Sequence, residues 1–252
     1  MSTETNKKSL MVCTPIHSEV SMHYMKACLD LQKECLLNKI KVTFQLMKSS
    51  LVTQGRNLCV SAFLQSDATH MLFIDSDIDF TTRSALRLFK CEHEVSLIPY
   101  PMKTVNETKF RKDLEKRPDD NSNTYGLIYP VTFGDENKIE PKNGFVEVIK
   151  GPTGMMMIQR SAFEKLMKEY NELNIIQQTM VNGEMTERPF YFNFFDSYYS
   201  PKTKTYTGED FYFCKLWTSM GGKIHALIDE DIAHVGEFKY SGKMFNEFVK
   251  TG

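Results

Sequence analysis

Apolar runs typical of strands alternate with helical patterns through the first hundred residues of the chain. "SLMVCTPI" (9–16) is expected to form a buried strand that ends at a Thr-Pro turn, and "KVTFQLMK" (41–48) alternates as a second strand. Helical patterns occupy 21–38 and 51–66. Alternation of this kind predicts an α/β fold in which a mostly parallel sheet is covered by helices on both faces.

The same alternation returns later in the chain, after an interruption. The interruption is the charged segment 103–124, which we interpret as a solvated loop or short surface helix, with a mobile flap near a site as the functional alternative. We recognise no pattern in 170–206. The remaining expected elements are strands at 70–76 and 95–101, a helix at 81–91, a strand–turn–strand–helix unit at 145–167, a helix at 208–222 and a strand at 223–229.

Composition excludes several classes of protein. The 252 residues are 41% hydrophobic and 25% charged, and 31 Lys and Arg balance 32 Asp and Glu, so no overall field favours nucleic acid or an anionic membrane. The N-terminus lacks the apolar core of a signal peptide, and no run approaches the roughly 18 apolar residues of a membrane span. We therefore expect a soluble protein of one domain over 1–252.

The six cysteines suggest a reducing compartment. Their spacing is irregular and contains no C-x-x-C pair, so free buried thiols are favoured over a disulfide or zinc framework, and we expect a cytoplasmic location. The cysteines are Cys13, Cys28, Cys35, Cys59, Cys91 and Cys214.

Three carboxylates at alternate positions follow the apolar run in "HMLFIDSDIDF" (70–80). Asp75, Asp77 and Asp79 would repel one another, and burial would add to the cost, so a positive group is expected beside them. Asp75 and Asp77 end a strand, where ligands gather in parallel sheets, and their oxygens suit Mg²⁺ or Mn²⁺. For Asp79 we favour the simpler role of beginning the turn and capping the next helix.

Two further places could carry chemistry. Gly208-Glu209-Asp210 could supply a general base, but on this stretch alone a Thr207 cap followed by acids that complement the helix dipole is favoured. His234 follows a late strand in "DEDIAHVGE". A lone His is usually a surface or core residue, yet a neutral imidazole is a competent third ligand for Mn²⁺.

Taken together, these pieces resemble the GT-A class of nucleotide-sugar-dependent glycosyltransferases. The resemblance rests on "THMLFIDSDIDF", "GPTGMMMIQRSAF", "GEDFYFC" and a late His in that order, and it spans most of 9–236. The stretch "LVTQGRNLCVSAFLQSDATHMLFIDSDIDF" (51–80) is similar to small GT-A enzymes of large DNA viruses and some bacteria. The resemblance implies a nucleotide-binding half at about 9–101 and an acceptor-side half at about 125–240.

The resemblance also assigns roles around the metal. It implies that Asp77 ligates Mn²⁺ or Mg²⁺ directly, that Asp75 contacts the ribose or a metal-bound water, and that Ser76 between them belongs to the donor site. His234 would be the late metal ligand.

Further roles concern the donor. The resemblance implies that Thr14 and Pro15 line the nucleoside pocket and that Arg56 meets the base or a phosphate. Gly154 would let the donor sugar approach the backbone.

The implied activity is transfer of a sugar from a UDP- or GDP-linked donor to a glycan, glycoprotein or other hydroxyl acceptor. Asp210, or less favourably Glu209, would act as the base, which favours an inverting course. The alternatives are a haloacid-dehalogenase-like phosphotransferase and a non-catalytic carbohydrate-binding protein. A haloacid-dehalogenase-like enzyme normally has Thr or Val two residues after the second Asp of the motif, where this chain has Asp79. The aromatic stretch "PFYFNFFDSYYSP" (189–201) fits sugar stacking and a buried core equally well.

Overall fold

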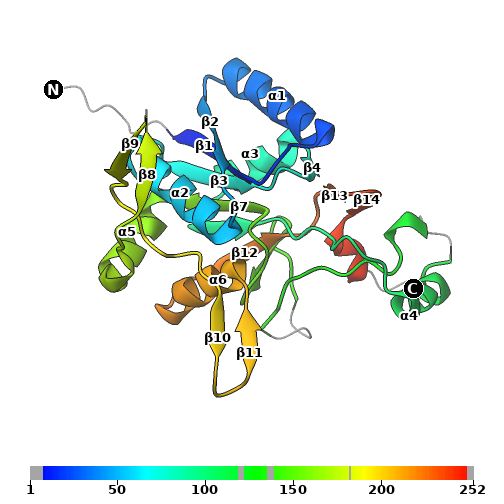
Figure 1. Cartoon of the computed structure of the whole chain (residues 1–252). Helices are drawn as coiled ribbons and strands as arrows, with labels where there is room; N and C mark the ends of the chain where they lie inside the picture. Colours follow the sequence, from blue (N-terminus) through cyan, green and yellow to red (C-terminus); the bar gives the residue numbers. More distant parts are fainter. Residues whose placement is uncertain (1–7, 119–121, 135–138, 182, 249–252) are drawn as a thin grey trace.

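A central sheet of seven strands organises the computed structural model, which describes residues 8–118, 122–134, 139–181 and 183–248 (Figure 1). The strand order is β2-β1-β3-β7-β5-β12-β6, and only β7 and β6 run against the other five. This confirms the expected α/β class with a mostly parallel sheet. The strands are β1 (Ser9–Ile16), β2 (Lys41–Lys48), β3 (His70–Ile74), β5 (Val95–Leu97), β6 (Phe145–Val148), β7 (Met155–Gln159) and β12 (Ile224–Leu227).

Helices cover both faces of this sheet (Figure 1). Successive side chains of a strand point to opposite faces, and in β3 Met71 and Phe73 join one buried cluster while Leu72 and Ile74 join the other. The first cluster packs against α2, α5 and α6, and the second against α1 and α3. The helices are α1 (Met22–Leu37), α2 (Val52–Leu64), α3 (Thr82–Lys90), α4 (Glu107–Lys116), α5 (Arg160–Glu169) and α6 (Glu209–Ser219).

Smaller elements lie outside the central sheet. A second sheet joins β4 (Ile78–Phe80), β13 (Ile232–Val235) and β14 (Lys239–Gly242), so the residues after β3 are tied to the end of the chain. Two hairpins fill part of the segment for which the sequence showed no pattern. They are β8 (Gln178–Val181) with β9 (Glu184–Glu187), and β10 (Tyr198–Ser200) with β11 (Thr205–Thr207). Short 3₁₀ turns occupy Ser122–Thr124, Asn171–Leu173 and Met244–Glu247.

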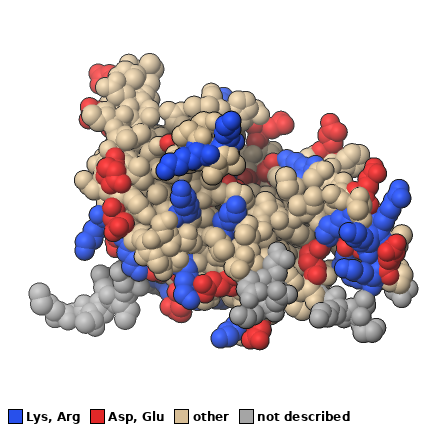
Figure 2. Space-filling model, turned by 90° about the horizontal axis from the view of Figure 1, so that it is seen from below, with Lys and Arg blue, Asp and Glu red and all other residues tan. Residues whose placement is uncertain are grey.

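The charged segment after β5 forms a surface helix, as expected. Helix α4 stands apart from the sheet in Figure 1, and Figure 2 shows Lys and Arg side chains gathered with acidic ones on that side of the molecule. Asp113 anchors the helix by accepting hydrogen bonds from Lys109 Nζ and from the Gly126 backbone N–H, both at 2.8 Å. No helix in the described part of the chain is long and apolar enough to cross a membrane.

Two capping assignments are wrong. Helix α3 is capped by Thr81, whose hydroxyl accepts the Ser84 N–H at 3.1 Å. Asp79 lies instead inside β4, where Lys239 Nζ neutralises it at 2.5 Å and His23 Nδ1 lies 3.6 Å away. Helix α6 has Gly208 at its N-cap position, so Thr207 caps nothing. The cysteine prediction is confirmed: all six thiols are free, and all but Cys91 are buried.

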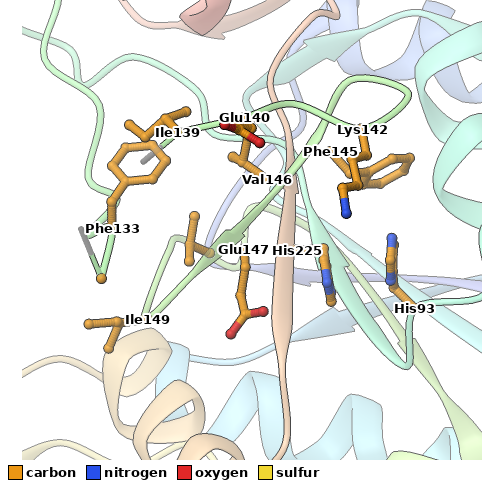
Figure 3. A pocket seen from close by; sticks show the side chains of 12 residues that line it. His93, Phe133, Ile139, Glu140, Lys142, Phe145, Val146, Glu147, Ile149 and His225 are labelled. Carbon is orange, nitrogen blue, oxygen red and sulfur yellow. The ribbon is translucent and has the colours of Figure 1, made fainter. Parts of the chain in front are cut away.

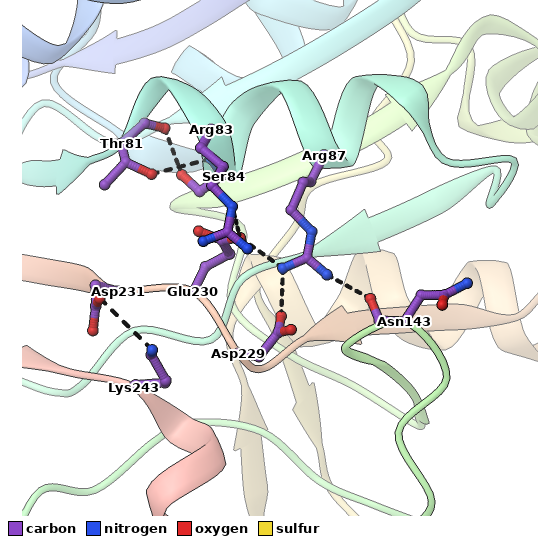
Figure 4. A network of polar contacts seen from close by, with 9 residues as sticks. All are labelled: Thr81, Arg83, Ser84, Arg87, Asn143, Asp229, Glu230, Asp231 and Lys243. Atoms are coloured by element: carbon purple, nitrogen blue, oxygen red, sulfur yellow. Dashed lines mark hydrogen bonds and ion pairs between the residues drawn. The ribbon is translucent and has the colours of Figure 1, made fainter.

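An ionic network built around the buried Glu230 ties α3 to the turn between β12 and β13 (Figure 4). Arg87 Nη1 donates to Asp229 and to Glu230, both at 2.6 Å, and Nη2 donates to the Asn143 carbonyl. Arg83 also reaches Glu230, which is only 4% exposed. Because β13 begins directly after this turn, the network helps to hold β13 beside β4.

Candidate active site

A pocket of about 490 Å³ opens at the carboxyl ends of the parallel strands β1, β2 and β3. Asp75, Ser76 and Asp77 line it together with Pro15, at the place beyond the carboxyl ends of parallel strands where open α/β sheets bind ligands. Thr14 is fully buried, and its hydroxyl lies 2.6 Å from that of Tyr24. The remaining lining comes from Ile16, His17 and the segment 49–52.

The pairing of β4 with β13 brings His234 to Asp77. His234 lies opposite Ile78 in this antiparallel ladder, and the Val235 N–H donates to the Asp77 carbonyl at 2.8 Å. The side chains meet as a result, with His234 Nε2 3.3 Å from Asp77 Oδ2. The ladder thus brings together, at one corner of the site, two residues that are 157 positions apart in sequence (77 and 234), and one of them, Asp77, lines the pocket.

The donor atoms at this corner fit a divalent cation. His234 Nδ1 lies 3.1 Å from the Pro101 carbonyl, which can only accept, so Nδ1 carries a hydrogen. In the neutral ring, Nε2, which lies beside Asp77, then has the lone pair that a cation would take. A ring N–H directed at a carbonyl is the usual support of a metal-ligating histidine. Among the described residues, however, no group of three His, Cys, Asp or Glu side chains is arranged as a complete metal site.

A lysine now neutralises Asp77. Lys103 Nζ lies 2.6 Å from Asp77 Oδ2, and its aliphatic stem packs over Gly236, where a β-carbon would lie 3.1 Å from Cδ. Burial opposes ionisation of Asp77, but hydrogen bonds from His234 and Lys103 outweigh it and lower the pKa to about 2. Asp77 is therefore ionised at neutral pH and available to a cation.

Asp75 faces away from this corner, toward Arg56. Arg56 is 3% exposed in α2; its Nη2 donates to Asp75 Oδ2 at 3.1 Å, and Nη1 lies 3.0 Å from Oδ1 without hydrogen-bond alignment. Its Nε donates to Glu209 Oε1 at 3.2 Å. Burial opposes the guanidinium charge, but Asp75 and Glu209 outweigh it and raise the pKa of Arg56. Arg56 therefore clamps the end of β3 to the start of α6.

Asp210 is the free acid of the first turn of α6. Within the described residues its Oδ1 accepts only the Phe211 N–H, at 2.7 Å, whereas its neighbour Glu209 is held by Arg56. Burial, followed by the charge of Glu209, raises the pKa of Asp210 to about 6. A carboxyl that titrates near neutral pH is suited to general base catalysis.

Tyr100 is a residue of this site that the sequence did not reveal. It follows β5, another parallel strand, and its hydroxyl occupies the space over Gly154, where a β-carbon would lie 2.5 Å from the hydroxyl oxygen. The Gly154 carbonyl accepts the Asp75 N–H at 2.9 Å. Burial and the charge of Asp75 raise the pKa of Tyr100 well above its ordinary value. Its position at a strand end was the available signal.

Asn57, the neighbour of Arg56, ties the aromatic segment to α2. Its side-chain amide bonds both the N–H and the carbonyl of Phe195, each at 3.0 Å, and Asn193 Oδ1 at 2.9 Å. The aromatic segment itself divides into two parts. Tyr191, Phe192, Phe194 and Phe195 are core residues, and Tyr198 and Tyr199 are exposed on β10.

A second hollow, of about 520 Å³, lies at the opposite edge of the sheet (Figure 3). Phe145 and Glu147 of the edge strand β6 line it beside His93 and His225, whose rings stack at 3.6 Å. Burial lowers the pKa of both histidines, His225 to about 4, so both are neutral at pH 7. None of the residues predicted for the site lines this hollow.

Comparison with known proteins identifies no family. No family model matches the sequence, and no curated protein matches it. The fold is similar to solved structures that include the following three. One is A197 from STIV, at 16% identity and a TM-score of 0.48, covering 90% of this chain and 86% of that one.

The other two are a glycosyltransferase involved in the glycosylation of the major capsid of PBCV-1 and 4-diphosphocytidyl-2C-methyl-D-erythritol synthase from Anaerococcus prevotii DSM 20548. The first gives 9% identity and a TM-score of 0.33, covering 65% of this chain and 67% of that one. The second gives 7% and 0.35, covering 69% and 78%. At these identities and TM-scores, the likenesses establish no activity for this chain.

Proposed function

We propose that the chain is a metal-dependent, inverting glycosyltransferase of the GT-A class that uses a nucleoside-diphosphate sugar. The observation that carries the proposal is the contact of Asp77 with His234 at a pocket beyond the parallel strand ends, with the ionisable Asp210 on the adjoining helix. The UDP- or GDP-linked donor would lie in the pocket lined by Pro15, Ser76 and Asp77.

Asp77 and His234 would hold Mn²⁺ or Mg²⁺. The ion would supply positive charge to the diphosphate that leaves with the nucleoside. Lys103, which now neutralises Asp77, would have to release that carboxylate. Arg56 binds both Asp75 and Glu209, so it fixes the Asp75–Asp77 segment relative to the start of α6.

Asp210 would take the proton from the attacking acceptor hydroxyl. The new bond forms between that oxygen and the anomeric carbon as the bond to the diphosphate breaks, and the proton moves to an Asp210 oxygen. An acid with a pKa of about 6 is ionised before the reaction at pH 7 and can release the proton afterwards. Attack opposite the leaving diphosphate inverts the anomeric carbon.

The hairpin β10–β11 offers a surface for a glycan or glycoprotein acceptor. Tyr199 and Tyr206 are paired across the hairpin and are 56% and 69% exposed. β11 ends at Thr207, three residues before Asp210, so a sugar stacked on these rings would approach the base.

The phosphotransferase alternative requires Asp75 as its nucleophile. Both oxygens of Asp75 face the Arg56 guanidinium, which lowers their nucleophilicity. A non-catalytic carbohydrate-binding protein remains the alternative from another class, and turnover separates it from an enzyme.

A donor screen tests the proposal. UDP- and GDP-linked sugars are incubated with the protein, with Mn²⁺ or with excess chelator, and slow donor hydrolysis is measured. We expect hydrolysis of at least one donor with Mn²⁺ only. Asp77→Ala should abolish it, and Asp79→Ala is the matched control, because Asp79 is two residues away but lines no part of this pocket. Release of inorganic phosphate without an acceptor would instead favour the phosphotransferase.

A further inference from the structure

Tyr100 places a hydroxyl among the carboxylates of the proposed site. Its ring is buried, and a β-carbon at Gly154 would lie 2.5 Å from its oxygen and 2.7 Å from its ring, so only glycine leaves room for it. The ring also meets the His234 ring edge-on, with centroids 5.0 Å apart. The hydroxyl is therefore held in one place by its surroundings.

This hydroxyl makes no hydrogen bond within the described part of the chain. It is not one of the side-chain polar atoms there that are both sealed from solvent and unpartnered, so the oxygen keeps some exposure. Those sealed atoms are Arg56 Nη1, His70 Nε2, Asp75 Oδ1, Thr153 Oγ1 and His225 Nδ1. A fixed, accessible and unpartnered hydroxyl is available to a ligand.

The charges around Tyr100 indicate the chemistry of that ligand. Asp75, Asp210 and Asp77 all act on the hydroxyl, and ionised carboxylates can only accept hydrogen bonds. Arg56 pairs with Asp75 and Lys103 pairs with Asp77, so among these acids only Asp210 has no ion pair within the described residues. A diphosphate also only accepts, and the unpaired Asp210 would repel it. A sugar hydroxyl can accept from Tyr100 while it donates to a carboxylate, so it satisfies both kinds of group.

We propose that Tyr100 is a substrate-binding residue that donates a hydrogen bond to a hydroxyl of the sugar being transferred. The inference rests on the proposed function and deepens it, because it assigns the sugar subsite to the floor formed by Gly154 and Tyr100. The donor sugar would then contact the Tyr100 hydroxyl, which lies over Gly154, and not the Gly154 backbone itself.

The test compares a sugar donor with its own nucleoside diphosphate. Binding of UDP, GDP, UDP-glucose, UDP-N-acetylglucosamine and GDP-mannose is measured by calorimetry with Mn²⁺, for the wild type and for Tyr100→Phe. The variant keeps the ring over Gly154 and loses only the hydroxyl. It should bind the sugar donor about two- to tenfold more weakly, which is the contribution of one hydrogen bond, and bind the free nucleoside diphosphate unchanged.

The chain offers a matched control in Tyr129→Phe. The Tyr129 hydroxyl also lies over a glycine, Gly242, but its charged neighbours are Glu247, Arg117 and Asp231 and not the predicted site residues. This variant should leave both affinities unchanged. Gly154→Ala keeps the hydroxyl and displaces it, so it should repeat the loss for the sugar donor if its melting temperature shows that it is folded.

The outcomes separate this inference from the proposed function. Equal weakening of nucleoside diphosphate and sugar donor in Tyr100→Phe would assign the hydroxyl to the diphosphate and overturn the inference. Unchanged affinity for both would overturn it as well, while leaving the donor site intact. A wild type that binds none of the nucleotides would contradict the proposed function itself, and the inference with it.

Discussion

Replacing Asp210 by Asn should make the protein more stable and less active. Asn has nearly the same shape but carries no charge, so the substitution removes the ionisation of a carboxyl whose pKa is raised to about 6 by burial and by Glu209. An acid with a raised pKa binds its proton more tightly when folded. Its ionisation therefore costs stability, beginning as the pH rises above 3.8 and reaching its full extent above 6.

The size of the effect follows from the two pKa values. One pKa unit corresponds to about 1.36 kcal/mol, so titration at about 6 instead of 3.8 destabilises the fold by up to about 3 kcal/mol. Asp210 is half-buried, and screening by solvent reduces this to about 1–2 kcal/mol. Asp210→Asn should gain that amount at pH 8 and nothing below about pH 4.

The assay is urea unfolding of both proteins at pH 8 and pH 4, together with kcat on the donor found by the screen. We expect kcat to fall by about 10²–10⁴-fold, the usual contribution of a general base, with donor affinity retained. Glu209→Gln is the control in the same helical turn. It should lose stability, because it leaves the buried Arg56 with one partner fewer.

The opposite result would refute this reasoning. If Asp210 serves only the helix N-terminus, Asn should lower stability at pH 8, by about 0.3–1 kcal/mol for a lost dipole interaction, and leave kcat nearly unchanged. The base would then have to be sought at Glu209 or in 186–206.

Further predictions concern the metal and the buried charges. Asp77→Ala should remove activity and retain the fold, and full activity in excess chelator would contradict the metal assignment. His234→Ala should weaken Mn²⁺ affinity in a direct binding titration, and unchanged affinity would exclude it as a ligand. Arg56→Met should lower the free energy of unfolding by about 3–5 kcal/mol, because it leaves two carboxylates without their partner, and a loss below 1 kcal/mol in urea would contradict the clamp. Burial lowers the pKa of His70 to about 4, so its contribution to stability is complete above pH 6.5 and is lost as the pH falls through 4; His70→Phe should abolish this part of the pH dependence, and identical unfolding curves between pH 7 and 4 would contradict it.

The parallel half of the fold could be predicted from the sequence because its signals are local. β1 and β2 have the expected bounds. β1 is a continuous apolar run, as expected of a strand covered on both faces, and β2, at the edge of the sheet, is marked by alternation. The presence of Asp75 and Asp77 at a strand end followed from the same pattern.

The rest of the site depends on pairings between distant segments. Nothing near His234 indicates that β13 pairs with β4, yet this ladder brings the imidazole to Asp77. The clamp by Arg56 likewise joins residues from α2, the end of β3 and the start of α6.

Short-range signals also failed where two explanations competed. Asp79 resembles a cap, but Thr81 has the extended backbone and the free hydroxyl that α3 requires. Tyr100 was missed because the sequence predicted a strand over 95–101 that would include it, whereas β5 ends at Leu97. The place of Tyr100 in the candidate site becomes visible only in the structure, where its hydroxyl lies against Gly154 and near the carboxylates of the site.

The most direct test of the proposed function is a crystal structure grown with Mn²⁺ and UDP or GDP, with anomalous data collected at the manganese edge. The account predicts an anomalous peak in contact with Asp77 Oδ2 and His234 Nε2, a nucleotide in the pocket of Pro15 and Ser76, and Lys103 displaced from Asp77. A structure with nucleotide bound elsewhere, or with no peak while Lys103 still pairs with Asp77, would contradict it.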